Sequence, residues 1–210
     1  MIDRQDLGRD RDFRELWTHQ ESLLLARREG KIADTLLLLE HQPVYTIGRT
    51  RDQSSLGSSA HLPHPVVEIN RGGQATYHGP GQLTGYAIID LNQYERDLHA
   101  HLRRLEEGLI RLLATYEVTA ERREGLTGVW IGPRKIASLG VGVRRWITMH
   151  GFAINITAES EAPFQHITPC GLDGVSMTSL ESESGTRPDM GEVKRRCGEI
   201  FNDIFSAPGH

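Results

Sequence analysis

Apolar side chains recur at every third or fourth position in three segments of this chain, a spacing that places them on one face of an α-helix. The segments are residues 11–29, which end near Gly30, residues 98–116 and residues 190–205. We therefore predict three amphipathic helices, each packed on the rest of the protein through its apolar stripe.

Shorter apolar runs predict strands in the first half of the chain. Residues 35–40 form one run, which opens into a loop around Pro43. Residues 66–70 and 86–91 form two more, on either side of the glycine-rich stretch 71–82. Runs of this length, bounded by glycine and proline, are typical of buried strands.

From Gly128 onward the apolar positions alternate with polar ones, the period of a β-strand. The short connection through Arg144 and Arg145 predicts that the last two strands form an antiparallel hairpin. Residues 50–65 and 159–189 show no period, and we expect loops there. The alternating positions are Val129, Ile131, Ala137, Leu139, Val141, Val143, Phe152, Ile154 and Ile156.

This mixture of helices with antiparallel and parallel strands predicts an α/β or α+β fold, with a mixed β-sheet flanked by helices. The chain has 210 residues, 38% of them hydrophobic and 25% charged, as in an ordinary globular protein. No repeat or low-complexity linker divides it. We expect one domain over residues 1–210.

Charge and hydropathy exclude several classes of protein. The start of the chain lacks the apolar centre of a signal peptide, and no stretch approaches the ~20 apolar residues that span a bilayer. The net charge of −4 argues against a general nucleic-acid binder. Two cysteines without clustered histidines predict neither disulfides nor a metal site. We expect a cytoplasmic protein that binds neither membrane nor nucleic acid.

The two cysteines differ in their surroundings. Cys197 lies on the apolar stripe of the last predicted helix, so we expect a small core side chain. Cys170 lies in the loop HITPCGLDG, between Pro169 and Gly171. It is either a nucleophile or a partly buried loop thiol, and a nucleophile would need a partner that promotes its thiolate.

Lysine is rare here, which makes Lys135 the leading candidate for that partner. Of 24 basic residues only Lys31, Lys135 and Lys194 are lysines. An ammonium can lose its proton when desolvated, whereas a guanidinium effectively cannot. The alternative for Lys135 is a solvated charge at a strand end. A histidine could serve instead, and the sequence does not rank these three: His78, His150 and His166.

The stretch RGGQATYHGPGQ lacks the GK[ST] ending of a phosphate-binding P-loop and the GxGxxG spacing of a dinucleotide site. Its glycines could line a narrow slot in which an elongated substrate lies against backbone, with Arg71 and His78 supplying polar contacts. They could equally meet the geometry of a tight strand connection.

Four segments in order, RGGQATYHGPGQ, PRKIASLGVGV, HGFAINI and ITPCG, together resemble the lipoyl(octanoyl) transferases of lipoate biosynthesis. With EHQPVYTIGR the resemblance runs from about residue 40 to 175. Two positions depart from the family pattern: Ala87, where proline is more frequent, and Thr168, where asparagine is more frequent. Neither departure falls on Cys170 or Lys135.

The resemblance implies the fold of biotin and lipoate protein ligases and a reaction without cofactor. An octanoyl group from octanoylated acyl carrier protein would pass to Cys170. It would then pass to a lysine of a lipoyl domain in 2-oxoacid dehydrogenases or of glycine cleavage H protein. Lys135 would promote the thiolate, and backbone N–H groups near Gly140 or Gly171 would bind the oxyanion. The implied acyl site comprises Arg71, Gly72, Gly73, Gln74, Ala75, Thr76, Tyr77, His78, Ser138, Leu139, Gly140, Gly151, Phe152 and Ala153.

Three other functions compete with this one. An ATP-dependent lipoate or octanoate ligase shares the fold but does not need the Cys170 thiol. A non-catalytic protein would only bind lipoyl or carrier domains, and an amidotransferase would take its acyl group from another lipoyl domain. In the transferase hypothesis, Arg144, Arg145 and neighbouring arginines would dock acidic carrier domains.

Overall fold

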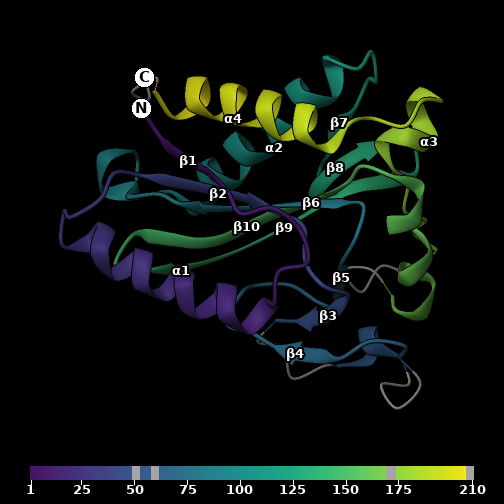
Figure 1. The fold of residues 1–210 in the computed structure, drawn as a ribbon, viewed down its shortest axis with the longest axis horizontal. Coiled ribbons are helices and arrows are strands. Elements are labelled where there is room, and N and C mark those ends of the chain that lie inside the picture. Colours follow the sequence, from purple (N-terminus) through teal and green to yellow (C-terminus); the bar gives the residue numbers. More distant parts are fainter. Residues whose placement is uncertain (49–52, 58–61, 169–173, 207–210) are drawn as a thin grey trace.

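The computed structural model describes residues 1–48, 53–57, 62–168 and 174–206. Its centre is a mixed sheet of seven strands (Figure 1), in which β1 pairs with β2 in parallel and all other neighbours are antiparallel. The spatial order is β1 (Asp3–Asp6), β2 (Thr35–Leu39), β6 (Gln82–Ile88), β10 (Ile147–Asn155), β9 (Arg134–Arg144), β8 (Leu126–Ile131) and β7 (Glu121–Arg123).

Helices cover both faces of this sheet, α1 (Phe13–Arg28) on one and α2 (Leu98–Ala114) with α4 (Met190–Ser206) on the other (Figure 1). Strand β2 is buried throughout and is leucine at every position after Thr35, because both of its faces are covered. Leu36 and Leu38 pack in the cluster of α2 and α4, whereas Leu37 and Leu39 pack with Leu16 of α1.

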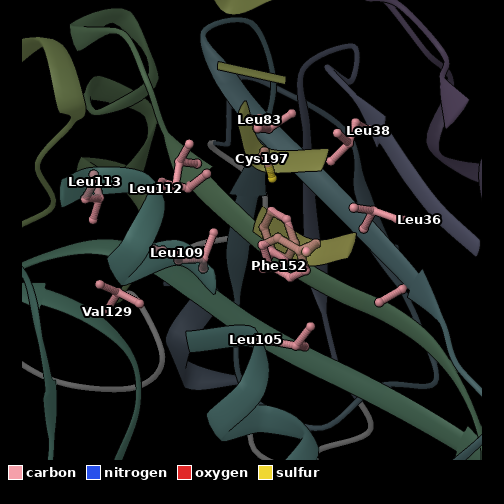
Figure 2. Close-up of a cluster of buried hydrophobic side chains, with 14 of the residues drawn as sticks. Leu36, Leu38, Leu83, Leu105, Leu109, Leu112, Leu113, Val129, Phe152 and Cys197 are labelled. Atoms are coloured by element: carbon pink, nitrogen blue, oxygen red, sulfur yellow. The ribbon is translucent and has the colours of Figure 1, made fainter. Parts of the chain in front are cut away.

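The main core lies between the sheet, α2 and α4 (Figure 2). The α2 leucines face Phe152 of β10, whose ring stacks on Phe201 of α4 at 5.0 Å between centroids. Gly108 allows α2 and α4 to approach, since a Cβ there would lie 2.5 Å from the Phe201 ring. Cys197 is fully buried in this core, and burial raises the pKa of its thiol, which confirms it as an unreactive core side chain.

A second, three-stranded sheet lies on the α1 side, in the order β4 (Val66–Glu68), β3 (Val44–Ile47) and β5 (Thr76–His78). Phe13 at the start of α1 packs against Val44, Val67 and Ile69, which joins this sheet to the helix. Short 3-10 turns and one short helix complete the described chain: Ser54–Leu56, Leu91–Gln93, Ala158–Ser160, Ala162–His166 and α3 (Leu180–Ser184).

The predicted helices, the mixed sheet and the final hairpin are confirmed. Strands β9 and β10 pair antiparallel, and Arg145 and Trp146 in the turn both have positive φ, 52° and 65°. Polar caps fix where two helices begin: Asp12 accepts a hydrogen bond from Glu15 N, and Asp97 accepts from His99 N at 2.7 Å.

The predictions were wrong at one strand boundary and at several short elements. The strand expected over 86–91 begins at Gln82, inside the glycine-rich stretch, and ends at Ile88. Strand β5 lies within the same stretch, and β3 lies where a loop was expected. Helix α3 interrupts the loop expected over 159–189. Elements of three to five residues are too short to show a period, so tertiary pairing decides them. Within the described ranges, no helix is long and apolar enough to cross a membrane.

Candidate active site

A cavity of about 370 Å³ lies between the large sheet and the glycine-rich stretch. All of the predicted acyl-site residues line it except Ala75 and Tyr77. Side chains of a strand alternate between its two faces, so Thr76 and His78 face the cavity. Ala75 and Tyr77 pack instead in a separate cluster with Tyr45. Those two predicted residues therefore shape the loop without lining the cavity.

Two rows of residues across β6, β10 and β9 form the cavity floor. One row is Thr84, Ala153 and Ser138, and the next is Tyr86, Gly151 and Gly140. The two glycines permit close approach: a Cβ on Gly151 would lie 2.3 Å from Gly85 O, and one on Gly140 would lie 2.8 Å from Arg71 Cδ. These two glycines therefore make room for the neighbouring strand and for Arg71, whereas Gly72 and Gly73 of the glycine-rich stretch themselves line the cavity.

Arg71 organises the glycine-rich stretch. Its guanidinium is buried and donates to the carbonyl oxygens of Gly72 (2.9 Å), Gln74 (3.0 Å) and Thr46 (3.2 Å). Gly72 N in turn donates to Val141 O of β9 at 3.4 Å. Arg71 lines the cavity, as predicted, and it also holds the cavity wall in shape through these bonds.

Lys135 is 1% exposed and lines the same cavity, so the alternative of a solvated strand-end charge was wrong. Its Nζ donates to Thr127 O at 3.0 Å and lies 5.3 Å from the centroid of the Trp130 ring. Its backbone N–H donates to Ser176 O at 2.9 Å. A buried cation held in this way faces whatever occupies the cavity.

Cys170, the predicted nucleophile, and Gly171, a predicted oxyanion donor, lie outside the described residues. The described residues on either side attach to the cavity wall. Thr168 N donates to Ser55 O at 2.8 Å, and the Ser55 hydroxyl donates to Gln74 Oε1 at 3.0 Å. On the other side, Ser176 O accepts the hydrogen bond from Lys135.

The three histidines considered as thiol partners separate in the structure. His166 is exposed and does not line the cavity, whereas His78 and His150 are buried and do. Burial holds the pKa of His78 well below its usual value. Burial, with the nearby Arg71 charge, lowers the pKa of His150 to about 4. Both are therefore neutral at pH 7.

A buried His41–Tyr86 pair supports the floor of the cavity. His41 Nδ1 lies 3.0 Å from Arg11 O, and burial lowers the His41 pKa to about 4. The ring is thus neutral with its proton on Nδ1, and Nε2 accepts a 2.6 Å hydrogen bond from the Tyr86 hydroxyl. Burial raises the Tyr86 pKa, so the hydroxyl keeps its proton. This pair holds the Tyr86 ring beside Gly151.

Sequence reasoning missed part of the lining, because it comes from elements that only the fold brings to the cavity. Thr84 and Tyr86 on β6 have the period-two spacing that could have revealed them once the strand boundary was known. The helix residues gave no such signal, since their apolar stripes predict only packing. The residues missed are Phe13, Ile69, Thr84, Tyr86, Leu98, Leu102, Gly125, Leu126, Thr127, Val141 and, as a lining residue, His150.

Several polar atoms in the cavity wall have no hydrogen-bond partner within the described part of the protein. They are Thr76 Oγ1, Thr84 Oγ1, Ser138 Oγ and His150 Nδ1. Buried polar groups are normally paired, so these atoms are available to polar atoms of a ligand or to water. Among the residues described, no cluster of three or more histidine, cysteine or acidic side chains could hold a metal ion.

The chain has the fold of the biotin and lipoate protein ligases. The chain superposes on the putative lipoate protein ligase Ta0514 from T. acidophilum with a TM-score of 0.71 and 14% identity, covering 100% of this chain and 88% of the other. For biotin protein ligase from Aquifex aeolicus the TM-score is 0.57 with 15% identity, covering 99% and 74%. The predicted fold is confirmed.

Sequence comparison narrows the class to a family. The lipoyl protein ligase A/B catalytic domain family matches residues 12–202, and the chain belongs to it. It is 51% identical to an octanoyltransferase of Geotalea uraniireducens over 92% of this chain and 89% of the relative. It is 42% identical to an octanoyltransferase of Flavobacterium psychrophilum over 97% and 96%. The resemblance seen in the motifs is thereby confirmed.

Proposed function

We propose that this chain is an octanoyltransferase that acts through a thioester on Cys170. It moves an octanoyl group from octanoylated acyl carrier protein to the ε-amine of a lysine on lipoyl domains, including those of 2-oxoacid dehydrogenases and glycine cleavage H protein. The observation that carries the proposal is the buried Lys135 cation in the wall of a cavity of ligand-binding size. Two relatives named octanoyltransferase, at 51% and 42% identity, support the acyl group and the reaction.

The chemistry has two steps that balance without a cofactor. The Cys170 thiolate attacks the donor thioester carbonyl, a new C–S bond forms as the bond to the carrier sulfur breaks, and the carrier thiol leaves with the proton of the Lys135 ammonium. The lysine amine of the acceptor then attacks the acyl-enzyme, an amide bond forms, and the Cys170 thiolate is released. Exchange between thioesters is nearly isoenergetic and amide formation from a thioester is downhill, so ATP is not required.

Lys135 has two tasks in this scheme. Its positive charge stabilises the Cys170 thiolate before acylation. After acylation its amine accepts the proton of the attacking lysine, a task that a permanently charged arginine could not perform. The described residues on either side of the loop that holds Cys170 support this scheme: Thr168 N donates to Ser55 O, and Ser176 O accepts from Lys135 N.

The tetrahedral intermediate needs hydrogen-bond donors for its oxyanion. Backbone N–H groups near Gly140 remain our candidates on β9, together with Gly171 in the loop. β8 pairs with β9 only as far as Ala137 within the described strands, so the edge of β9 at Ser138, Leu139 and Gly140 faces the cavity. The unpartnered Ser138 hydroxyl lies in the same wall.

We further propose that residues 1–210 act as one catalytic domain in the cytoplasm. The match of a single family to residues 12–202 supports one domain. The free, buried thiol of Cys197 suits a reducing compartment.

The decisive experiment is incubation with octanoylated acyl carrier protein, followed by intact-mass measurement. We expect one added octanoyl group in the wild type and in Cys197→Ala, the control that removes the buried thiol. We expect none in Cys170→Ser. An adduct of normal yield in Cys170→Ser would refute the thioester mechanism, and absence of any adduct in the wild type would favour a non-catalytic binding protein.

A second incubation separates the transferase from a ligase. Free octanoate, ATP and an acceptor lipoyl domain, without carrier protein, should give no modified acceptor. Modification under these conditions would identify an ATP-dependent ligase. Modification from an octanoylated lipoyl domain as donor, with no activity toward octanoylated carrier, would identify an amidotransferase.

A further inference from the structure

A carboxylate is buried close to the proposed catalytic lysine. Glu106 lies on α2, and its side chain is 0% exposed. A buried carboxylate is costly unless charges and hydrogen bonds compensate it. Arg103 Nη1 lies 2.5 Å and Arg122 Nε 3.3 Å from Oε2. The other oxygen, Oε1, accepts a 3.0 Å hydrogen bond from Gly128 N.

A single peptide group connects Glu106 to Lys135. The N–H of Gly128 and the C=O of Thr127 belong to the same planar unit. The N–H side of that unit donates to Glu106, and its carbonyl side accepts the hydrogen bond from Lys135 Nζ at 3.0 Å. A carboxylate at one end of a peptide polarises it, which strengthens the carbonyl as an acceptor at the other end.

Gly128 also fixes the path of the lysine side chain. Its φ of +138° suits glycine, and a Cβ there would lie 2.5 Å from Lys135 Cε and 3.1 Å from Nζ. The Lys135 stem therefore runs directly against the Gly128 backbone, with the Trp130 ring 5.3 Å from Nζ. Moving the Thr127–Gly128 peptide would move the ammonium within the cavity wall.

We propose that Glu106 is a positioning residue for the transfer reaction, acting on Lys135 through the Thr127–Gly128 peptide. Its hydrogen bond holds the peptide so that the Thr127 carbonyl fixes Nζ at the cavity, and its charge sets the pH range in which transfer is fast. The inference rests on the role proposed above for Lys135. In the competing explanation, Glu106 only ties α2 to β8 and contributes stability alone.

The first test is Glu106→Gln, with Glu107→Gln as its matched control. Glu107 is the next residue on α2 and pairs with Arg111 and Arg122 at the surface. We expect Glu106→Gln to lower kcat at least tenfold, with KM for octanoylated carrier protein within twofold of wild type. We expect Glu107→Gln to match wild type in both constants.

The pH–rate profile gives a readout that a purely structural role would not change. The charged groups around this unit are Arg103 and Arg122 at Glu106, with Glu107 on the far side of Arg122 at 2.7 Å. Arg123 is the third cation, and its guanidinium lies 4.8 Å from the Trp130 ring centroid. Removing the buried negative charge of Glu106 from among these cations disfavours positive charge nearby. The rising limb of the profile should therefore move to lower pH in Glu106→Gln. An unchanged kcat and profile, with only a lower unfolding temperature, would refute the proposal.

A double-mutant cycle tests whether Glu106 acts through Lys135. Single-turnover formation of the acyl adduct is followed in the wild type, Glu106→Gln, Lys135→Met and the double variant. We expect Glu106→Gln to cause no further loss once Lys135 is methionine. An equal loss in both backgrounds would refute the link and leave the transferase function standing. A wild-type rate in Lys135→Met would refute the proposed role of Lys135, and the inference with it.

Discussion

His101 makes a prediction about acid stability that does not depend on the function. It lies on α2, is fully buried, and packs against Phe205 at 5.8 Å between ring centroids. Neither ring nitrogen has a hydrogen-bond partner within the described residues. Burial, with a smaller contribution from Arg104, lowers the pKa of His101 to about 3. The folded protein therefore keeps this ring neutral at pH values where the unfolded chain protonates it.

The direction of the pH effect follows from proton binding. Below the unfolded histidine pKa of about 6.5 the unfolded chain binds a proton at this position that the folded protein does not, so stability falls as pH falls. The loss from this one residue is about 1.4 kcal/mol per pH unit well below pH 6.5, and about 2 kcal/mol in total between pH 7 and pH 5. It stops growing near the folded pKa of about 3.

The test is urea unfolding of the wild type and of His101→Leu at pH 7 and pH 5, under conditions where unfolding is two-state. The variant removes the titrating group and fills the site with an apolar side chain. We expect its free energy of unfolding to fall by about 2 kcal/mol less than that of the wild type over this interval. An equal fall in both proteins would refute the reasoning, because it would mean that His101 does not titrate differently in the two states.

Two further predictions concern the catalytic chemistry and the carrier surface. Lys135→Arg should fold but lose nearly all transfer of octanoyl to the acceptor, measured by intact mass of the lipoyl domain; wild-type rates would show that positive charge suffices without proton transfer. Arg144 and Arg145 make no ion pair with any residue that the structure describes. Replacing both by glutamate should raise KM for acyl carrier protein at low salt several-fold and reduce its salt dependence, and a salt-insensitive wild-type KM would contradict this docking surface.

The sequence determined those parts of the fold in which apolar positions recur with the period of a helix or a strand. The leucines of α2 and the alternating apolar positions of β9 and β10 lie in one shared core, so pattern and structure agree. The burial of Cys197 was predicted for the same reason, since a cysteine on the apolar stripe of a helix is buried with that stripe. The motifs also determined the family, which the comparisons confirm.

Tertiary structure decided what depends on contacts between distant segments. Strands β3 and β5 are too short to show a period, and they exist because they pair with each other. The side of β5 that faces the cavity was set by that pairing, which turned Tyr77 away from it.

The same limit applies to Glu106, which in sequence is one charge among many on a helix. Only the fold brings its carboxylate to the N–H of Gly128 and brings Lys135 Nζ to the carbonyl oxygen of Thr127 in the same peptide group. A sequence pattern records which face of an element is buried, whereas the partner across the core depends on packing that no local period encodes.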